Sequence, residues 1–252
     1  MKTKSKFLKG FLFFIMFLSA TACSSSSTST DSGDTLTVTG SSLATETSDS
    51  VSITLPGLSA DTTTSGSPTA FTIQLYQVYV GLSADCTDLT LVKDNGDAPE
   101  SFDMLSSPTL FSATVDAGTY NCLALVISDN MIFTPDTTAA ESFPSSCVAG
   151  ESATFDIYRS DGSDSTTWKD INGDDITAHG TPSAPVADVI TFFATTDTSA
   201  ASTALGLSEF QVGELTGALT VPASVVFYTD FSNQVSENDG HCWLEGGSLG
   251  FR

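Results

Sequence analysis

The sequence predicts an all-β protein: a single antiparallel β-sandwich with long polar loops, which follows a signal peptide and a flexible tether. Short segments that alternate apolar and polar residues recur along the chain, and turn-forming residues separate them, as in β-sandwiches. Only residues 200–210 suggest a short helix. The hydrophobic content of 40%, with 17 phenylalanines, excludes wholesale disorder.

The first 22 residues have the pattern of a signal peptide. Four lysines, the last of them Lys9, precede the apolar run 10–18, and the small residues 19–22 lead to Cys23. This arrangement resembles the lipobox of bacterial lipoproteins, although Ala20 stands where that family usually has a larger aliphatic residue. The resemblance implies that Cys23 is lipidated and becomes the N-terminus. The alternative is ordinary secretory cleavage nearby, with Cys23 a spare thiol.

The mature chain is expected to consist of a tether and one domain. Residues 23–34 comprise the lipidated cysteine and a Ser/Thr-rich tether, and residues 35–252 form the sandwich without a Pro/Gly linker or a repeat. Ser24 follows the cysteine, where members of the lipoprotein family kept at the inner membrane typically carry aspartate. By this resemblance we expect an outer-membrane protein anchored by its lipid, facing the periplasm or the cell surface.

The alternation of apolar residues predicts the strands in order. In the first half we expect strands at 35–39, 51–56, 71–75, 76–80, 89–92, 110–115 and 119–128. The apolar positions change phase between Leu75 and Tyr76, which predicts a β-bulge. Both faces of 119–128 are apolar, so this strand should be central and buried on both sides.

The second half continues in the same style. Further strands are expected at 154–158, 186–194, 215–221, 224–231 and 247–251, with long polar loops at 134–150, 159–185 and 232–246.

The chain is strongly acidic. It has 30 acidic residues against eight basic ones, a formal net charge of −22, and removal of the four leader lysines makes it more negative by four. Such a chain lacks the cations that neutralise phosphates, so we expect no binding to nucleic acid. The acidity favours cations, neutral surfaces or basic proteins as partners. The alternative is that it serves only solubility.

Four cysteines remain after Cys23, and an even number in an exported protein predicts two disulfides with three connectivities open. We expect Cys86–Cys122 with Cys147–Cys242, because this pairing is sequential and avoids crossed loops. The chain has no Cys-x-x-Cys pair, which argues against a redox site or a zinc knuckle.

The segment 116–122, with Asp116, Gly118, Tyr120 and Cys122 at alternate positions, resembles strand F of an immunoglobulin-like sandwich. In that family the tyrosine hydroxyl caps the backbone at the corner and the cysteine bridges the two sheets. The A-G-T-Y part also resembles hairpins of prealbumin-like domains in bacterial surface lipoproteins. The partner cysteine Cys86 is only 36 residues upstream, and no tryptophan lies between the two.

Catalytic motifs are weak. Residues 246–250 match G-x-S-x-G, the pattern around the nucleophilic serine of many hydrolases. That motif needs a helix after the serine and a histidine later in the chain, but only two residues follow it and both histidines, His179 and His241, precede it. We therefore expect a glycine-rich final strand and no catalytic residues. Trp168 and Trp243 are expected to be packing anchors.

Asp170, Asn172 and Asp174 match the start of a calcium loop, in which oxygen ligands stand at alternate positions. Asp175 and Thr181 replace the turn glycine and the closing glutamate, so an EF-hand is excluded. A looser calcium site could recruit Asp161 or Asp164 and the carbonyl of Ile176. The alternative is a solvated acidic loop.

From these observations we expect a lipid-anchored, non-catalytic binding or structural module of the cell envelope, whose partner is an envelope or extracellular protein or a glycan. Two alternatives remain: a secreted hydrolase that acts on glycans with two carboxylates, and a calcium-stabilised surface adhesion protein.

Overall fold

The structure is a computed structural model, and it describes residues 34–42, 51–54, 66–136, 147–157, 168–176, 187–207, 211–238, 241–244 and 248–252. All of them belong to one compact unit, which runs from Gly33 to Arg252. The predicted leader, the lipidated Cys23 and the predicted tether up to residue 33 lie outside the described residues, and Asp34, the last residue of the predicted tether, begins the first strand.

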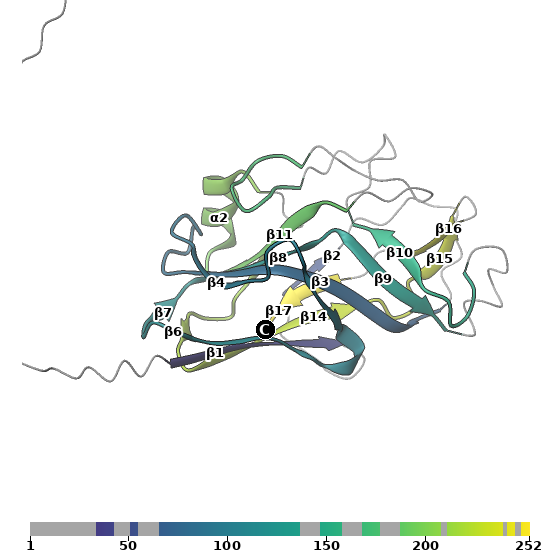
Figure 1. Cartoon of the computed structure of the whole chain (residues 1–252). Helices are drawn as coiled ribbons and strands as arrows, with labels where there is room; N and C mark the ends of the chain where they lie inside the picture. The colour runs from purple at the N-terminus through teal and green to yellow at the C-terminus, as the bar shows by residue number, and fades with distance from the viewer. Residues whose placement is uncertain are drawn as a thin grey trace, which may run out of the picture. The chain divides into compact units, whose positions relative to one another are not determined.

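Strands dominate the described chain, with one α-helix and one 3-10 turn, so the predicted all-β, sandwich-like fold is confirmed (Figure 1). The elements are β1 (Asp34–Ser42), β2 (Val51–Thr54), β3 (Pro68–Gly81), β4 (Thr90–Asp94), β5 (Glu100–Asp103), η1 (Met104–Ser106), β6 (Thr109–Val115), β7 (Thr119–Tyr120), β8 (Cys122–Ser128), β9 (Asn130–Pro135), β10 (Ala153–Asp156), β11 (Val189–Thr195), α2 (Thr198–Leu205), β12 (Val212–Glu214), β13 (Leu219–Thr220), β14 (Ala223–Asp230), β15 (Val235–Asn238), β16 (His241–Leu244) and β17 (Ser248–Phe251).

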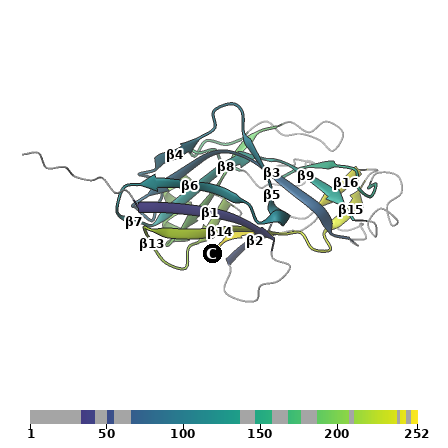
Figure 2. The same ribbon diagram turned by 60° about the horizontal axis from the view of Figure 1, so that its bottom comes forward.

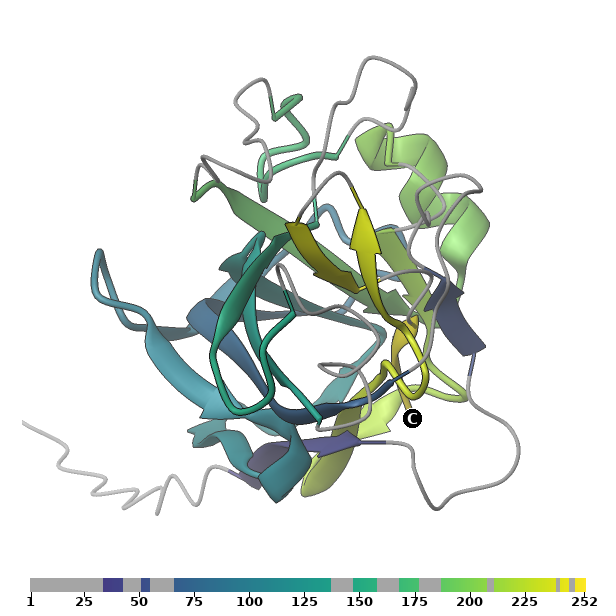
Figure 3. The same cartoon turned by 90° about the vertical axis from the view of Figure 1, so that its right-hand side faces the viewer.

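Two main sheets carry the fold. The five-stranded sheet has the order β2-β17-β14-β1-β6, and the eight-stranded sheet has the order β10-β9-β3-β8-β11-β12, with β4 and β5 on the other edge of β3. Figure 2 shows β1 between β6 and β14, and Figure 3 shows the strands of both sheets around a shared interior. The pairs β1–β14 and β11–β12 are parallel, and the other named pairs are antiparallel, so the sandwich is of mixed type.

The main core lies between the two sheets. On β3 the residues Phe71, Ile73 and Leu75 are fully buried, and burial then resumes at Val78. The register of β3 with β8 shifts between Leu75 and Gln77, which confirms the predicted bulge. The bulge keeps the apolar residues on the core side after the change of phase.

Strand β8 is buried along its whole length and lies between β3 and β11, as predicted. Leu123, Leu125 and Ile127 face the main core. On the opposite face Cys122 and Ala124 belong to a second apolar cluster, which α2 helps to cover (Figure 3). The predicted helix is confirmed at Thr198–Leu205, where Asp197 accepts a hydrogen bond from the first turn.

Two predicted regions differ from the structure. The expected loop 232–246 contains the hairpin of β15 and β16, two strands of only four residues each that are too short to show a clear alternation. The expected strand 215–221 is wrong, because exposed residues 216–218 separate β12 from the two-residue strand β13. None of the described helices has the length and apolar character that crossing a membrane requires.

Candidate functional site

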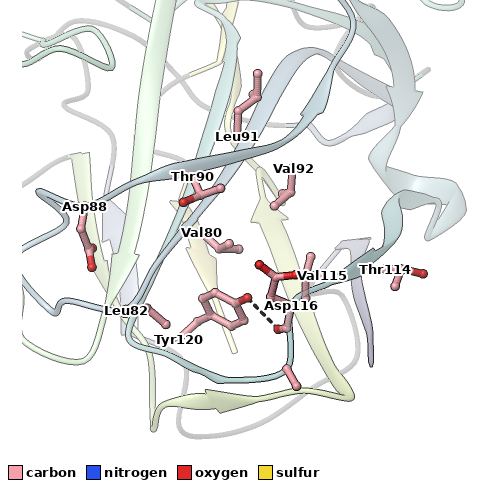
Figure 4. Close-up of a pocket in the computed structure, with 11 residues that line it drawn as sticks. Val80, Leu82, Asp88, Thr90, Leu91, Val92, Thr114, Val115, Asp116 and Tyr120 are labelled. Atoms are coloured by element: carbon pink, nitrogen blue, oxygen red, sulfur yellow. Dashed lines mark hydrogen bonds between the residues drawn. The ribbon is translucent and has the colours of Figure 1, made fainter. Parts of the chain in front are cut away.

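A pocket of about 400 Å³ opens between β4 and the end of β6, and we call it the seam pocket (Figure 4). β4 belongs to the eight-stranded sheet and β6 is an edge strand of the five-stranded sheet, so the pocket lies where the two sheets approach each other. It is lined by Val80, Leu82, Asp88, Thr90, Leu91, Val92, Thr114, Val115, Asp116, Ala117 and Tyr120.

The seam pocket has an apolar floor and a mixed lining that includes Asp88, Thr90, Thr114 and Asp116. Val80 and Val115 are buried core residues that form its floor. Leu82 is 58% exposed beside the pocket, although it is a large hydrophobic residue. Leu91 is 42% exposed, but its side chain points away from the pocket (Figure 4). An exposed apolar side chain beside a concave apolar floor is typical of a binding surface.

Tyr120 fixes one end of the seam pocket. Its hydroxyl donates a hydrogen bond of 2.8 Å to the backbone carbonyl of Asp116, drawn in Figure 4. This bond confirms the cap on the corner that the immunoglobulin-like resemblance implies. Burial, and then the negative charge of Asp116, raise the pKa of the Tyr120 hydroxyl, so it remains a hydrogen-bond donor at neutral pH.

The loop between β3 and β4, residues 82–89, carries Leu82 and Asp88 to the rim. The disulfide Cys86–Cys122 ties this loop to β8, and the pairing is the one predicted. The resemblance implied a bridge between the two sheets, and that expectation is wrong. Both ends of the disulfide lie in the second apolar cluster, on the outer side of the eight-stranded sheet.

Hydrogen bonds make the same loop rigid. The amide of Ser83 donates to both carboxylate oxygens of Asp88, at 3.0 and 3.1 Å. Asp85 accepts from the hydroxyls of Ser83 and Thr87, and these bonds lower the pKa of its carboxyl. A side chain at Gly81 would come within 2.8 Å of the Asp88 carboxylate, so the close approach requires glycine there. The rim is therefore held in place before any ligand binds.

The second disulfide, Cys147–Cys242, also has the predicted pairing. It joins the segment before β10 to the β15–β16 hairpin, and neither cysteine lines the seam pocket. The bridge therefore stabilises a different part of the domain.

The candidate calcium residues lie in a turn with its own hydrogen bonds. Asp170 accepts from the amides of Asn172 and Asp174, at 2.8 and 3.0 Å, and its second oxygen accepts from the side-chain amide of Asn172 at 3.2 Å. Lys169 forms an ion pair of 2.5 Å with Asp175 beside the turn. Gly173, with φ at 82°, supplies the left-handed residue that the turn needs.

No group of three His, Cys, Asp or Glu side chains within the described ranges is arranged to hold a metal ion. Asp161, Asp164 and Thr181 lie outside those ranges. The calcium site therefore stays a prediction, and the described turn is ordered by hydrogen bonds among its own residues.

The described residues of the other sequence motifs lie in strands or in the core. Ser248 begins the final strand β17, as expected, and β17 pairs with β14 and β2. His241 lies in β16, and His179 lies outside the described residues. Trp168 is a packing anchor, since it is 1% exposed and its ring meets that of Phe192 edge-on at 5.4 Å.

A carboxyl with a strongly raised pKa, Asp129, was not singled out by the sequence. Asp129 is fully buried at the break between β8 and β9, where one oxygen accepts from the amide of Asp188 at 2.7 Å. Burial, and then the neighbouring charge of Asp156, raise the pKa of Asp129 to about 8. The sequence around Asp129 has no periodicity or motif that predicts this role. The raised pKa is evident only from the structure, in which Asp129 is buried near other carboxylates.

The chain matches no profile of a protein family, no curated protein sequence and no solved structure.

Proposed function

We propose that this protein is a lipid-anchored, non-catalytic binding module of the cell envelope, and that the seam pocket is its binding site. The observation that carries the proposal is Leu82, a 58% exposed hydrophobic residue beside a pocket with an apolar floor, on a loop tied to β8 by the Cys86–Cys122 disulfide. A site preorganised in this way binds without first ordering its loops.

Two other features support a location in the cell envelope. Two disulfides suit an oxidising compartment such as the periplasm or the cell surface. The leader and Cys23 resemble those of lipoproteins, and lipid chains on that cysteine would give a stable anchor.

A glycan hydrolase is the weaker proposal. Such an enzyme needs a carboxyl of raised pKa beside a second carboxyl in an open cleft. Asp129, whose carboxyl has a strongly raised pKa, is fully buried and does not line the seam pocket. The geometry therefore favours binding over hydrolysis.

The test has two parts. In the first, wild type and Cys23→Ala are compared for attachment to membranes and for the mass of the mature N-terminus. We expect the wild type to be acylated and membrane-bound and the variant to be released or left uncleaved. An unmodified N-terminus in the wild type would overturn the anchor.

In the second part, a photo-crosslinking residue replaces Leu82 in cells that express the full chain. We expect it to capture a component of the envelope. The matched control is Val189, which is 39% exposed but lies at the far end of the same sheet, where it pairs with Ser128. Equal capture from both positions, or none from Leu82, would overturn the seam pocket as the binding site.

A further inference from the structure

We propose that the seam pocket takes a lysine or arginine side chain from an extended basic segment of a protein partner. This inference rests on the proposed function and names the class of ligand. The evidence for it is that carboxylates, apolar side chains and unpaired strand edges occur together at the seam pocket.

The charges of the seam pocket are of one sign. Asp88 and Asp116 line it, and no basic residue does. Neither described lysine lines it: Lys93, at the other end of the seam, forms an ion pair with Glu100 at 2.6 Å, and Lys169 forms one with Asp175. With a net charge of −22 on the whole chain, the potential at the pocket attracts a cation.

Asp116 is the carboxylate best placed to bind that cation. Its side chain is exposed and accepts no hydrogen bond from a described residue, whereas both oxygens of Asp88 already accept from Ser83. Its backbone is fixed by the bond from Tyr120. An incoming ammonium or guanidinium group therefore meets a carboxylate that is carried on a fixed backbone and is able to accept a charge-assisted hydrogen bond.

The walls suit the aliphatic stem of a long basic side chain. Val80, Val92 and Val115 line the pocket beside the ring of Tyr120 (Figure 4). Lysine and arginine pack their methylene groups on such surfaces while the charged head reaches a polar group. A small inorganic cation would leave these apolar walls without a partner.

The strand edges at the seam suit an extended backbone. In the described residues β4 pairs only with β3 and β6 pairs only with β1, although β4 and β6 are neighbours (Figure 2). Lys93 of β4 reaches across to the carbonyl of Leu110 in β6 at 3.5 Å, which holds the seam at one end. At the other end the facing edges leave backbone groups that an added strand can use.

The experiment measures binding of capped seven-residue peptides to the detergent-solubilised full chain by calorimetry. The peptides alternate valine with lysine, with glutamine or with glutamate. We expect the lysine peptide to bind, with affinity that falls as salt is added, and the other two to bind at least about five-fold more weakly, since an exposed charge-assisted contact contributes roughly 1 kcal/mol.

Two matched variants separate a local contact from general attraction. Asp116→Asn keeps the backbone carbonyl that Tyr120 uses and removes the charge, so it should weaken the lysine peptide about five-fold. Asp97→Asn removes the same charge from an exposed turn that does not line the pocket, so it should leave affinity unchanged. Equal binding of the lysine and glutamine peptides, equal loss in both variants, or no binding of any peptide would overturn this inference. Crosslinking from Leu82 would still test the proposed function separately.

Discussion

Two buried polar side chains hold irregular segments against the eight-stranded sheet, and they do so with opposite chemistry. Gln211, just before β12, is fully buried; its side-chain amide donates to the carbonyls of Lys169 and Thr191, at 2.7 and 3.0 Å. Its oxygen accepts from the amide of Lys169 at 2.7 Å. The Gln211 side chain thus takes the place of a neighbouring strand, with every hydrogen-bonding group matched.

Asp129 holds the start of β11 in a similar way but with a carboxyl group. Its backbone amide donates to the carbonyl of Asp188 and its side chain accepts from the amide of Asp188. The second side-chain oxygen is buried without a described donor, and Asp156 lies close by. A neutral amide can match donors and acceptors at any pH, whereas a carboxylate among carboxylates needs a proton.

The largest effect is expected for Gln211→Ala. The change leaves two carbonyls and one amide without their partner, and it should lower the free energy of unfolding by about 3 kcal/mol. Urea unfolding of the full chain at pH 7 measures this loss. Gln211→Met is the matched control, because it nearly preserves volume but makes none of these bonds. If methionine restored most of the stability, packing and not hydrogen bonding would be the role of Gln211.

The next effect is a change with pH, which is smaller than the loss at Gln211 over any one pH unit. The folded pKa of Asp129, about 8, is raised above its ordinary value of 3.8, so its stabilising contribution is fully present below pH 3.8 and is lost as the pH rises through 8. Asp129→Asn supplies an oxygen for the Asp188 amide and a donor toward Asp156 without a charge. Its unfolding free energy should therefore increase relative to wild type between pH 4 and 8, by at most about 1.4 kcal/mol per pH unit.

Urea unfolding at several pH values between 4 and 8 gives this difference directly. Asp97→Asn, which removes an exposed charge, should show a nearly constant difference from wild type over the same range. A flat difference for Asp129→Asn would mean that its carboxyl does not take up the proton, and the contrast with Gln211 would fail.

The smallest effect is expected at Asp170, a carboxylate satisfied by amides in an exposed turn. Asp170→Ala removes the acceptor for two backbone amides and should cost about 1 kcal/mol or less, since water can replace it. Because the oxygens of Asp170 are already engaged, we expect millimolar calcium and magnesium to raise the melting temperature of the full chain equally. A rise specific to calcium that disappears in Asp170→Ala/Asp174→Ala would instead establish the calcium site.

The local pattern of apolar and polar residues, together with short motifs, predicted much of this fold. Alternation identified the β8 region as central because both of its faces are apolar, and a change of phase located the bulge next to Tyr76. Sequential spacing gave both disulfide pairs, and a short motif gave the bond from Tyr120 to Asp116. The strand, the bulge and the tyrosine bond depend on residues that are near one another in the sequence, and the disulfides depend only on the order of the cysteines.

The candidate site could not be predicted in the same way. The seam pocket joins residues of 80–92 to residues of 114–120, and only tertiary structure brings them together. Gln211 and Asp129 carry no sign of their burial, because polar residues are usually exposed. The calcium motif was conspicuous in the sequence, yet its first aspartate is engaged in the hydrogen bonds of an ordinary turn.

The position of β1 has a mechanical consequence. This first described strand lies between two neighbours in its sheet, paired with β14 from Leu36 to Ser42 and with the edge strand β6 from Asp34 to Thr39. A pull on the chain before Asp34 acts along the strand, so it shears both ladders together and cannot open them one bond at a time. A protein tethered at this end would transmit tension into a strand that is paired on both sides, and that strand would yield only when many bonds break at once.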